Sequence, residues 1–467
     1  MADVQVGVSD VVVKKLSIES SHGAIDVSGV FNELNIYEDM FSNALTADLT
    51  LSESYNLPYK LPIIGEETLD IDVKLEGTSG TQVGTYLKAP KFFLYDINNR
   101  FHHIKPDGIG AAKAQTYTMH FISEQGMSNV HSRVSKSYQT STAAEIVEDI
   151  FYDYLYDGFH ELQVSPSEGI IPCVIPNWTP HQACNWLAGR ARSAEYDTAV
   201  NYLFYETMDS INFTNLGDIA DISSEKPVLT FLQGVRADDP TGIEGLQLAN
   251  VNIDQLTFVN QFDRIKNAKR GQYASKLVTH DIVTKKIEQY DYNGLHDWMK
   301  FVHTGDFPPL PYSDVDIASA FKNRTSLAPS DYKVVDGESL QTFTDSSVSF
   351  YPKHSQMFAQ TPGHNYDNEV EKWKLQRAGQ MSLYTDGYTL QIQCAGLPML
   401  RVGHIVTVFV AAPESTSENK HGVGIDKFLS GNYMVTAIRH IITKDGYRMY
   451  VEVSRDGLGE MPTGRTK

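Results

Sequence analysis

The sequence predicts a β-rich α+β fold, and two observations carry that prediction. Segments near both ends alternate between apolar and polar residues, whereas helical periodicity with capping signals occurs in the middle and once near the C-terminal end. An alternation of period two gives a strand one buried face and one wet face, which is typical of antiparallel sheets and small barrels. Glycine and proline clusters separate the alternating segments, as turns between strands require.

The N-terminal part, residues 1–135, is predicted to be a first β domain. Apolar residues alternate with polar ones in residues 45–51, 69–75 and 117–121. Each segment has the length of an ordinary strand, so we expect several antiparallel strands here.

A small α+β domain is expected over residues 136–225. Thr142 followed by Glu145 is a capping box, and apolar residues follow at helical spacing. A second helix is expected after Thr179, which suits the N-cap and precedes a proline at the first helical position. Residues 202–213 are predicted to form a pair of strands that closes this domain.

β character returns in residues 226–293 and 366–458, which we assign to a second β domain. It includes a helix expected at 368–384 and a hairpin whose turn contains Asp445 and Gly446. Residues 294–365 are rich in Pro, Ser, Asp and Gly, so we expect a loop-rich insertion there, and residues 459–467 are expected to be a flexible tail.

The two β regions share an internal echo. Alternating segments at 69–73, 92–97 and 117–121 have the same order and similar spacing as those at 403–408, 433–438 and 449–453. Such a recurrence is consistent with two structurally related domains, although any two β domains can show it.

Composition and charge exclude several classes of protein. The chain has 467 residues, a formal net charge of −19 and three cysteines, Cys173, Cys184 and Cys394. The acidic balance argues against a general nucleic-acid or anionic-membrane binder, because such binders need a basic surface. The few cysteines and the lack of a secretory signal indicate folding in a reducing compartment, and no segment is apolar over enough residues to predict membrane insertion.

No recognisable catalytic motif is present, so we predict no enzyme activity, no catalytic residue, no cofactor and no metal site. The chain lacks the zincin, CxxC, P-loop, dinucleotide-binding and nucleophile-elbow patterns. His102 and His103 are adjacent on an expected strand and therefore face opposite sides, which makes them a poor chelate. His404 and His440 lie on strands that could be neighbours, where structural histidines are the simpler interpretation.

Other candidates have ordinary structural explanations. The cysteines fit inert thiols, and carboxylate pairs such as Glu66 and Glu67 arise by chance in a chain with 58 acidic residues. Trp178, Trp186 and Trp373 could stack on sugars, but their positions at helix starts and on helical stripes favour core packing. The proline-rich segment 307–311 is either a rigid loop or a ligand for a partner.

Three stretches resemble the baseplate central hub protein of contractile-tailed bacteriophages of the T-even type. They are residues 175–188 (IPNWTPHQACNWLA), residues 386–408, which contain DGYTLQIQC and LRVGHIVTV, and residues 428–440 (FLSGNYMVTAIRH). The last pattern is also similar to the hub portion of type VI secretion spike proteins. Residues 36–51 look like the first barrel of the same family, and the resemblance spans most of residues 20–456.

The resemblance implies a fold with two hub-type β-barrel tube domains, a small α/β domain and insertions. It implies a homotrimeric ring with pseudo-six-fold symmetry, which joins the hexameric tail tube to the trimeric central spike and lines the DNA channel. Other baseplate wedge proteins would be further partners, and DNA would pass the lumen without specific binding. The virion baseplate, assembled in the host bacterial cytoplasm, is the location it implies. An acidic lumen would reduce sticking of DNA phosphates.

Two alternatives stay open from the residues alone. A tail-associated receptor-binding or glycan-binding protein is suggested by the tryptophan and tyrosine content. A cell-wall hydrolase would have its active site in residues 294–365, although no lysozyme or amidase pattern is visible there.

Overall fold

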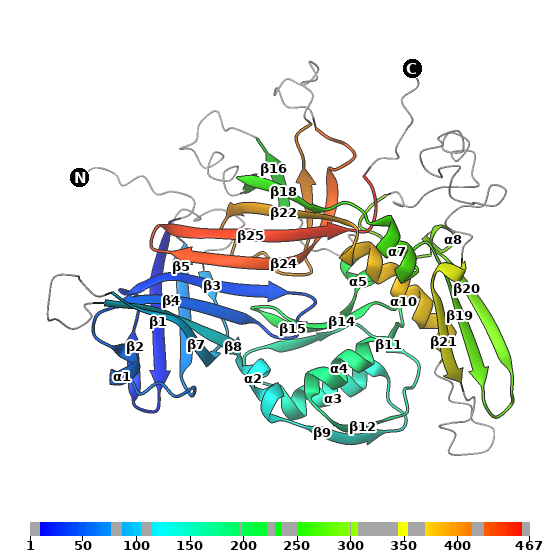
Figure 1. Cartoon of the computed structure of the whole chain (residues 1–467), viewed down its shortest axis with the longest axis horizontal. Coiled ribbons are helices and arrows are strands. Elements are labelled where there is room, and N and C mark those ends of the chain that lie inside the picture. Colours follow the sequence, from blue (N-terminus) through cyan, green and yellow to red (C-terminus); the bar gives the residue numbers. More distant parts are fainter. Residues whose placement is uncertain are drawn as a thin grey trace.

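The computed structural model describes most of the chain. The described residues are 10–75, 86–103, 114–196, 199–221, 229–234, 251–298, 300–306, 344–353, 369–412 and 425–459. Fifteen of their strands belong to one large sheet, which antiparallel pairs dominate (Figure 1). The predicted β-rich α+β fold is therefore confirmed.

The N-terminal part of the large sheet, which we call the first strand set, comprises eight strands. They are β1 (Val11–Ser20), β2 (Gly23–Asp26), β3 (Phe31–Asp39), β4 (Thr46–Glu53), β5 (Thr68–Leu75), β6 (Tyr86–Lys88), β7 (Phe92–His103) and β8 (Ala114–Ser123). The short helix α1 (Leu57–Lys60) connects β4 to β5. Every second residue of β8 is buried, as the alternation predicts.

The second strand set contributes the rest of the large sheet. It comprises β16 (Leu229–Gln233), β17 (Asn252–Ile253), β18 (Gln255–Asn260), β22 (Tyr388–Ala395), β23 (Ile405–Phe409), β24 (Gly431–Thr443) and β25 (Gly446–Arg455). β24 and β25 form the predicted hairpin, and Gly446 lies just after the turn with a φ of 149°, a backbone conformation that favours glycine.

The two sets have the same order of neighbouring strands. The first runs β3-β4-β8-β7-β5-β1-β2, and the second runs β18-β22-β25-β24-β23-β16-β17. One irregularity matches as well, because the β7–β8 pairing shifts between Leu94 and Asp96 and the β24–β25 pairing shifts between Val435 and Ala437, although β7–β8 has a further shift between Asn98 and Phe101. The echo noticed in the sequence is thus present in the strand pairing.

A small α+β region lies between the two strand sets along the chain, after helix α2 (Glu124–His131). Its elements are β9 (Val134–Tyr138), α3 (Ala143–Tyr154), β10 (Glu161–Val164), β11 (Ser167–Glu168), β12 (Cys173–Trp178), α4 (Pro180–Ala188), β13 (Arg192–Ser193), β14 (Tyr202–Glu206), β15 (Ser210–Asn215) and α5 (Leu216–Ala220). The capping box at Thr142 and Glu145 and the N-cap at Thr179 are present, as predicted.

A separate three-stranded sheet departs from the expected organisation. β19 (Ala274–Asp281) pairs with β20 (Ile287–Asn293) and with β21 (Val348–Lys353), and neither β19 nor β20 joins the second strand set. We assigned residues 226–293 to the second β domain and expected a loop-rich insertion in 294–365. The structure instead pairs β19 and β20 with β21, a strand within the insertion. The alternation in β19 and β20 indicates half-buried strands but not the sheet to which they belong.

Helices accompany this third sheet. They are α7 (Arg264–Arg270), α8 (Gly294–Trp298), the 3-10 turn η3 (Thr344–Ser346) and α10 (Val370–Thr385), of which α10 was predicted. Arg377 of α10 is partly buried and donates to the backbone carbonyls of Ala188, Val200 and Tyr202 at 3.1–3.2 Å. Burial lowers the pKa of Arg377 to about 10, and the three carbonyls anchor α10 to the small α+β region.

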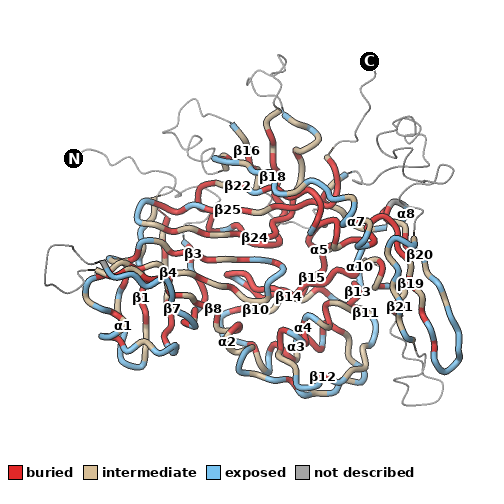
Figure 2. The backbone as a smooth tube through the Cα atoms, viewed as in Figure 1, coloured by how far each residue is buried: buried red, intermediate tan, exposed pale blue. Residues whose placement is uncertain are grey.

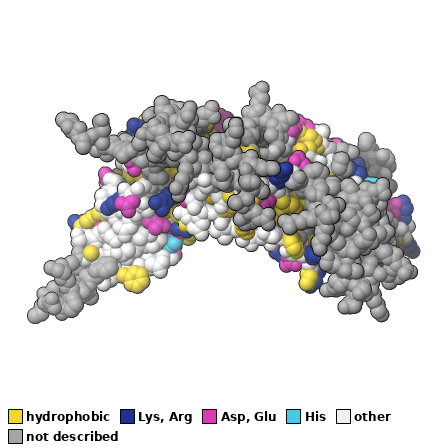
Figure 3. Space-filling view, turned by 90° about the horizontal axis from the view of Figure 1, so that it is seen from above, with side chains coloured by type: hydrophobic (Ala, Val, Ile, Leu, Met, Phe, Trp, Pro, Cys, Tyr) yellow, Lys and Arg dark blue, Asp and Glu magenta, His cyan; other side chains and the backbone are white. Residues whose placement is uncertain are grey.

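The largest hydrophobic core draws residues from both strand sets. Leu16, Ile36 and Met119 of the first set and Ile392 and Val451 of the second are almost completely buried within it. Figure 2 shows the buried backbone following the middle of the large sheet and the strands β14 and β15. Seen from above, the molecule has an arched outline that is hollowed on one side (Figure 3).

The chain stays anchored for several residues after Arg455, close to the expected start of the flexible tail. Asp456 is 2% exposed, and its carboxylate accepts from the N–H and the hydroxyl of Thr304 at 3.0 and 2.7 Å. Of the expected flexible tail 459–467, residues 460–467 lie outside the described part.

Substitution Thr142→Ala should destabilise the small α+β region. The Thr142 side chain accepts from the N–H of Glu145, and loss of such a cap costs about 1 kcal/mol. Chemical denaturation followed by circular dichroism measures this cost. The exposed Thr140→Ala is the matched control, and an equal effect of both substitutions would contradict the role of the cap.

Candidate assembly site

The two strand sets are joined edge to edge where β3 pairs with β24, and we call this pairing the seam. The seam is antiparallel and runs from Asp39 opposite Ala437 to Glu33 opposite Thr443. It joins four strands of each set into one run, β18-β22-β25-β24-β3-β4-β8-β7, in which every pair is antiparallel. The seam therefore makes one sheet of two similar halves.

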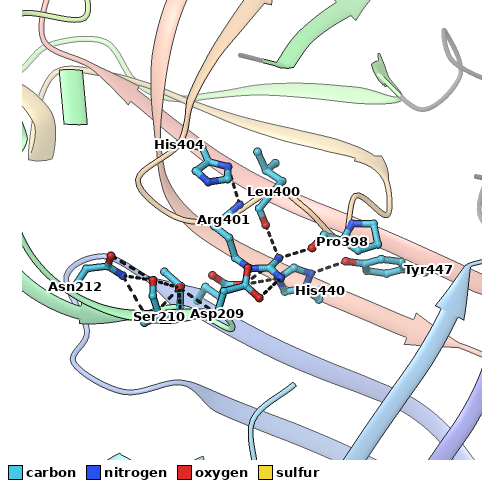
Figure 4. Close-up of polar contacts among 11 residues, drawn as sticks. Asp209, Ser210, Asn212, Pro398, Leu400, Arg401, His404, His440 and Tyr447 are labelled. Atoms are coloured by element: carbon cyan, nitrogen blue, oxygen red, sulfur yellow. Dashed lines mark hydrogen bonds and ion pairs between the residues drawn. The ribbon is translucent and has the colours of Figure 1, made fainter. Parts of the chain in front are cut away.

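A buried polar cluster lies under the seam (Figure 4). Glu38 of β3 and His440 of β24 have side chains that are 0% exposed, and His440 Nε2 lies 3.1 Å from Glu38 Oε1. The other ring nitrogen, Nδ1, is 2.7 Å from the hydroxyl of Tyr447 on β25. Burial lowers the pKa of His440, so the ring is neutral, donates from Nε2 to Glu38 and accepts from Tyr447.

Arg401, just before β23, supplies the positive charge of this cluster. One guanidinium nitrogen lies 4.0 Å from Glu38, and two others donate to the carboxylate of Asp209 at 2.6 and 3.1 Å. The same guanidinium donates to the carbonyls of Pro398 and Leu400 at 2.5 and 2.9 Å. Burial would lower the pKa of Arg401, but the charges of Glu38 and Asp209 raise it, so the group stays charged.

Because Asp209 connects β14 to β15, Arg401 ties three parts of the chain together. It contacts the first strand set through Glu38, the small α+β region through Asp209 and its own second strand set through two carbonyls. Such a cluster resists rearrangement, since removing one partner leaves a buried charge without compensation. Its residues are closed to solvent apart from Asp209, whose side chain is 64% exposed, so they suit positioning rather than chemistry.

A second buried carboxylate joins the small α+β region to the first strand set. Glu206 accepts from the N–H of Leu45 at 2.9 Å and from the hydroxyl of Ser123 at 2.5 Å. Its other oxygen lies 3.8 Å from His160, whose ring is held by Asp157 at 2.6 Å. The Glu206 and His160 side chains are 0% exposed, so this joint also has no access for a substrate.

The opposite face of the eight-strand run is polar and carries a shallow groove of about 330 Å³ at the seam. The groove is lined by Tyr37, Asp39, Arg439, Tyr450 and Glu452, and Glu38 of the buried polar cluster also reaches it. Burial raises the pKa of Asp39 above its ordinary range.

The residues singled out in the sequence do not converge on one site. His404 and His440 do come close to the same cluster, where His404 Nδ1 accepts from the N–H of Arg401 at 3.3 Å. His102 is exposed on β7, far along the run from the seam. Burial raises the pKa of the Cys184 and Cys394 thiols, and Glu67 is buried with its carboxylate accepting from two backbone N–H groups.

The tryptophans and the described part of the insertion likewise show no assembled site. The rings of Trp178 and Trp186 lie 5.8 Å apart, and the Arg190 guanidinium covers Trp186 at 3.9 Å. Trp373 is 8% exposed in a separate core. The segment 307–311 and most of the insertion lie outside the described residues.

One buried pair in the described part of the insertion has the residue types of an acid–base site. His303 Nδ1 lies 2.5 Å from Asp456, but its Nε2 lies 2.7 Å from the carbonyl of Trp298. Both ring nitrogens are thus occupied by structural partners, which leaves none for a nucleophile. Across the described ranges no cluster of His, Cys, Asp and Glu could hold a metal ion, and none of the helices there has the length and apolarity of a membrane span.

Sequence reasoning missed Glu38, Arg401 and Asp209. A signal was present for Glu38, because it falls in phase with the inward residues Leu34 and Ile36 of the same strand. A carboxylate at an inward position needs a buried partner. Nothing in the sequence indicates that this partner lies more than 360 residues away.

No known protein-family profile matches the chain, and no curated protein matches its sequence. Solved structures do resemble it. A tail protein of Neisseria meningitidis is 12% identical, with a TM-score of 0.48 and coverage of 95% of this chain and 97% of that one. A 43 kDa tail protein of prophage MuSo2 from Shewanella oneidensis is 10% identical, with a TM-score of 0.49 and coverage of 96% and 100%.

A third similar structure is a type VI secretion component of E. coli. It is 8% identical, with a TM-score of 0.41 and coverage of 97% of this chain and 79% of that one. These three similar structures are thus two tail proteins, one of them from a prophage, and a component of type VI secretion. These are the kinds of protein that the sequence motifs resemble.

Replacing Arg401 by leucine should destabilise the fold by about 3 kcal/mol or more, because Glu38 then keeps a buried charge with only a neutral partner. Arg439→Leu is the matched control, since the Arg439–Glu33 pair in the same seam is about 40% exposed on both sides and such pairs contribute less than about 1 kcal/mol. Denaturant unfolding measures both variants, and equal losses would contradict the assignment of Arg401.

The neutral state of His440 predicts a pH dependence. Its pKa is lower in the folded chain than in the unfolded one, so the unfolded chain binds the extra proton first. Stability should therefore fall as the pH drops below about 6.5, the ordinary histidine value. In His440→Gln the loss of unfolding free energy between pH 7.5 and 5.5 should be smaller, and an unchanged slope would refute this.

Proposed function

We propose that this chain is the structural hub of a contractile phage tail baseplate. The observation that carries the proposal is the pair of strand sets with one strand order, joined edge to edge by the seam. Each chain contributes two similar strand sets, so an assembly of three chains contains six of them. A homotrimer would then offer six similar faces to a hexameric tail tube and three to a trimeric central spike.

In this proposal each strand set is a small barrel tube domain, and the connections within each set support it. In the first set, the link from β2 to β3 bonds to both neighbours, with Val27 donating to Leu16 of β1 and Val30 accepting from Ser52 of β4, each at 2.9 Å. In the second set, residues 252–260 pair first with β16 and then with β22. These links connect the two outer strands of each set, β2 with β3 and β17 with β18. A sheet whose outer strands are connected in this way can close into a barrel.

The polar face of the eight-strand run would line the DNA channel. The carboxylates on this face are Glu33, Asp39, Asp48, Asp96 and Glu452, whereas its arginines are Arg439 and Arg448. An excess of negative charge there would repel DNA phosphates, so that DNA passes without specific binding. This is the acidic lumen that the net charge of the chain led us to expect.

In this proposal the protein has no enzymatic role and is a virion component that assembles in the host cytoplasm. The central spike protein, the tail tube protein and the wedge proteins of the baseplate would be its partners. The buried clusters at the joints support this role, because a part that transmits contraction forces needs rigid connections between its units.

Mass and symmetry test the proposal. We expect the full-length protein alone to reach three times the chain mass of 52.2 kDa in analytical ultracentrifugation, or to enter a complex with the spike and tube proteins of the same phage as three copies. Electron microscopy should then show a three-fold ring with a central hole. A species that remains monomeric at high concentration and in the presence of both partners would overturn the proposed function.

A further inference from the structure

Three aromatic side chains are exposed together at the end of α3 and in the turn that follows it. Tyr152 is 59% exposed, Tyr156 is 56% exposed and Phe159 is 45% exposed. The rings of Tyr152 and Tyr156 have centroids 5.8 Å apart, and both meet the ring of buried Phe151 edge to face, at 5.1 and 5.9 Å. These contacts hold the two tyrosine rings in place, so a partner that binds them would order few further side chains.

The core of the small α+β region does not use these exposed rings. The inward side of α3 buries Ile146, Val147, Ile150 and Phe151 in that core, together with residues of α4 and β14. In Figure 1 the strands β14 and β15 lie between these helices and the large sheet. The side of α3 that carries Tyr152 is therefore turned to solvent. Exposed aromatic side chains that no core requires are typical of contact surfaces.

The same surface is strongly acidic. Residues 137–189 contain seven carboxylates but no lysine or arginine, and the seven are Glu145, Glu148, Asp149, Asp153, Asp157, Glu161 and Glu168. Glu148 is exposed one helical turn before Tyr152, on the same side of α3, and Glu161 is exposed two residues after Phe159. Lys136 of β9 pairs with Asp149 and Asp153 at 2.5 and 3.1 Å, whereas Glu148 and Glu161 have no ion pair among the described residues.

One cation of the chain already lies on this surface. The ammonium group of Lys88, on β6 of the first strand set, is 5.9 Å from the centre of the Phe159 ring. A cation in that position is attracted by the negative face of the ring. In the described part of the chain no cation lies over Tyr152 or Tyr156. An arginine suits these tyrosines best, because its planar guanidinium can stack on a ring and donate to a carboxylate at the same time.

We propose that the exposed aromatic and acidic side chains at this end of α3 bind a basic segment of another tail protein. We call this site the acidic aromatic surface, and it comprises Glu148, Tyr152, Tyr156, Phe159 and Glu161. The inference deepens the proposed function, on which it rests, by giving the place and the charge of one partner contact. A second copy of this chain, with its net charge of −19, and a neutral glycan both lack the positive charge that the surface attracts.

Site-directed crosslinking tests which molecule occupies the surface. A photoreactive phenylalanine analogue replaces Tyr152 in the full-length chain, which is assembled with the spike, tube and wedge proteins of the same phage and irradiated. We expect one of these proteins to be linked, and mass spectrometry should place the link beside a lysine or arginine of that protein. The control carries the analogue in place of Gln182, an exposed residue of the neighbouring helix α4, and should not give this link.

Matched variants test the chemistry of the contact with the linked protein. Tyr152→Ala/Tyr156→Ala should weaken binding at least about tenfold, because two aromatic contacts are lost, whereas Tyr152→Phe/Tyr156→Phe keeps both rings and should stay within about threefold of the unsubstituted chain. Glu148→Lys/Glu161→Lys should weaken binding at least about tenfold, and added salt should then lower the affinity less than it does for the unsubstituted chain. Isothermal titration calorimetry at two salt concentrations measures these effects. Equal affinities of the alanine and phenylalanine variants would overturn the inference.

The outcomes separate this inference from the proposed function. A link to a basic segment of another tail protein, absent from the Gln182 control, supports the inference. A link to a second copy of this chain, or no link within an assembled three-fold ring, overturns the inference and leaves the proposed function standing. Binding of host polysaccharide that Tyr152→Ala/Tyr156→Ala abolishes would assign the surface to a glycan and overturn the inference as well. A strictly monomeric protein that binds none of the three partners overturns both.

Discussion

The carboxylate of Glu38, buried at the pairing of β3 with β24, is the constraint on which the arrangement of the molecule depends. A charge without solvent must find its partners within the protein, and here they come from three parts of the chain. The neutral ring of His440 donates to it from the second strand set, and Arg401 adds a positive charge that also holds Asp209. In the observed register of the seam Glu38 meets both His440 and Arg401, and loss of either partner would weaken the compensation of its buried charge.

The same principle recurs at the other junctions. Glu206 accepts from backbone and side-chain donors of the first strand set, and Arg377 donates to three carbonyls of the small α+β region. Asp456, just after β25, accepts a hydrogen bond from the backbone N–H of Thr304 and so anchors the end of this strand. Buried polar groups with specific partners occur where segments distant in sequence meet. Because hydrogen bonds require a specific geometry, each such contact fixes the relative orientation of the two segments.

Much of the local structure followed from the sequence. The capping box at Thr142, the helix entry at Thr179 and the hairpin at Asp445 depend on residues a few positions apart, so their physics is local. The spacing of alternating segments was also consistent with two similar β regions, which the strand order then showed. Sheet membership was different, because the alternation in β19 and β20 is the same whether they pair with β22 or with β21. The charged cluster was missed for a related reason, since a lone Glu in an apolar phase predicts a partner without saying where it is.

The sequence by itself determined many of the strands, the capped helices and the β24–β25 hairpin, and it suggested that the β pattern occurs twice. Those properties come from periodicity and from interactions within a few residues. Only the tertiary structure decided that β3 joins β24 and that β19 to β21 form their own sheet. Such pairings join residues hundreds of positions apart, and their selection depends on shape and on the cost of unpaired buried groups rather than on local preference.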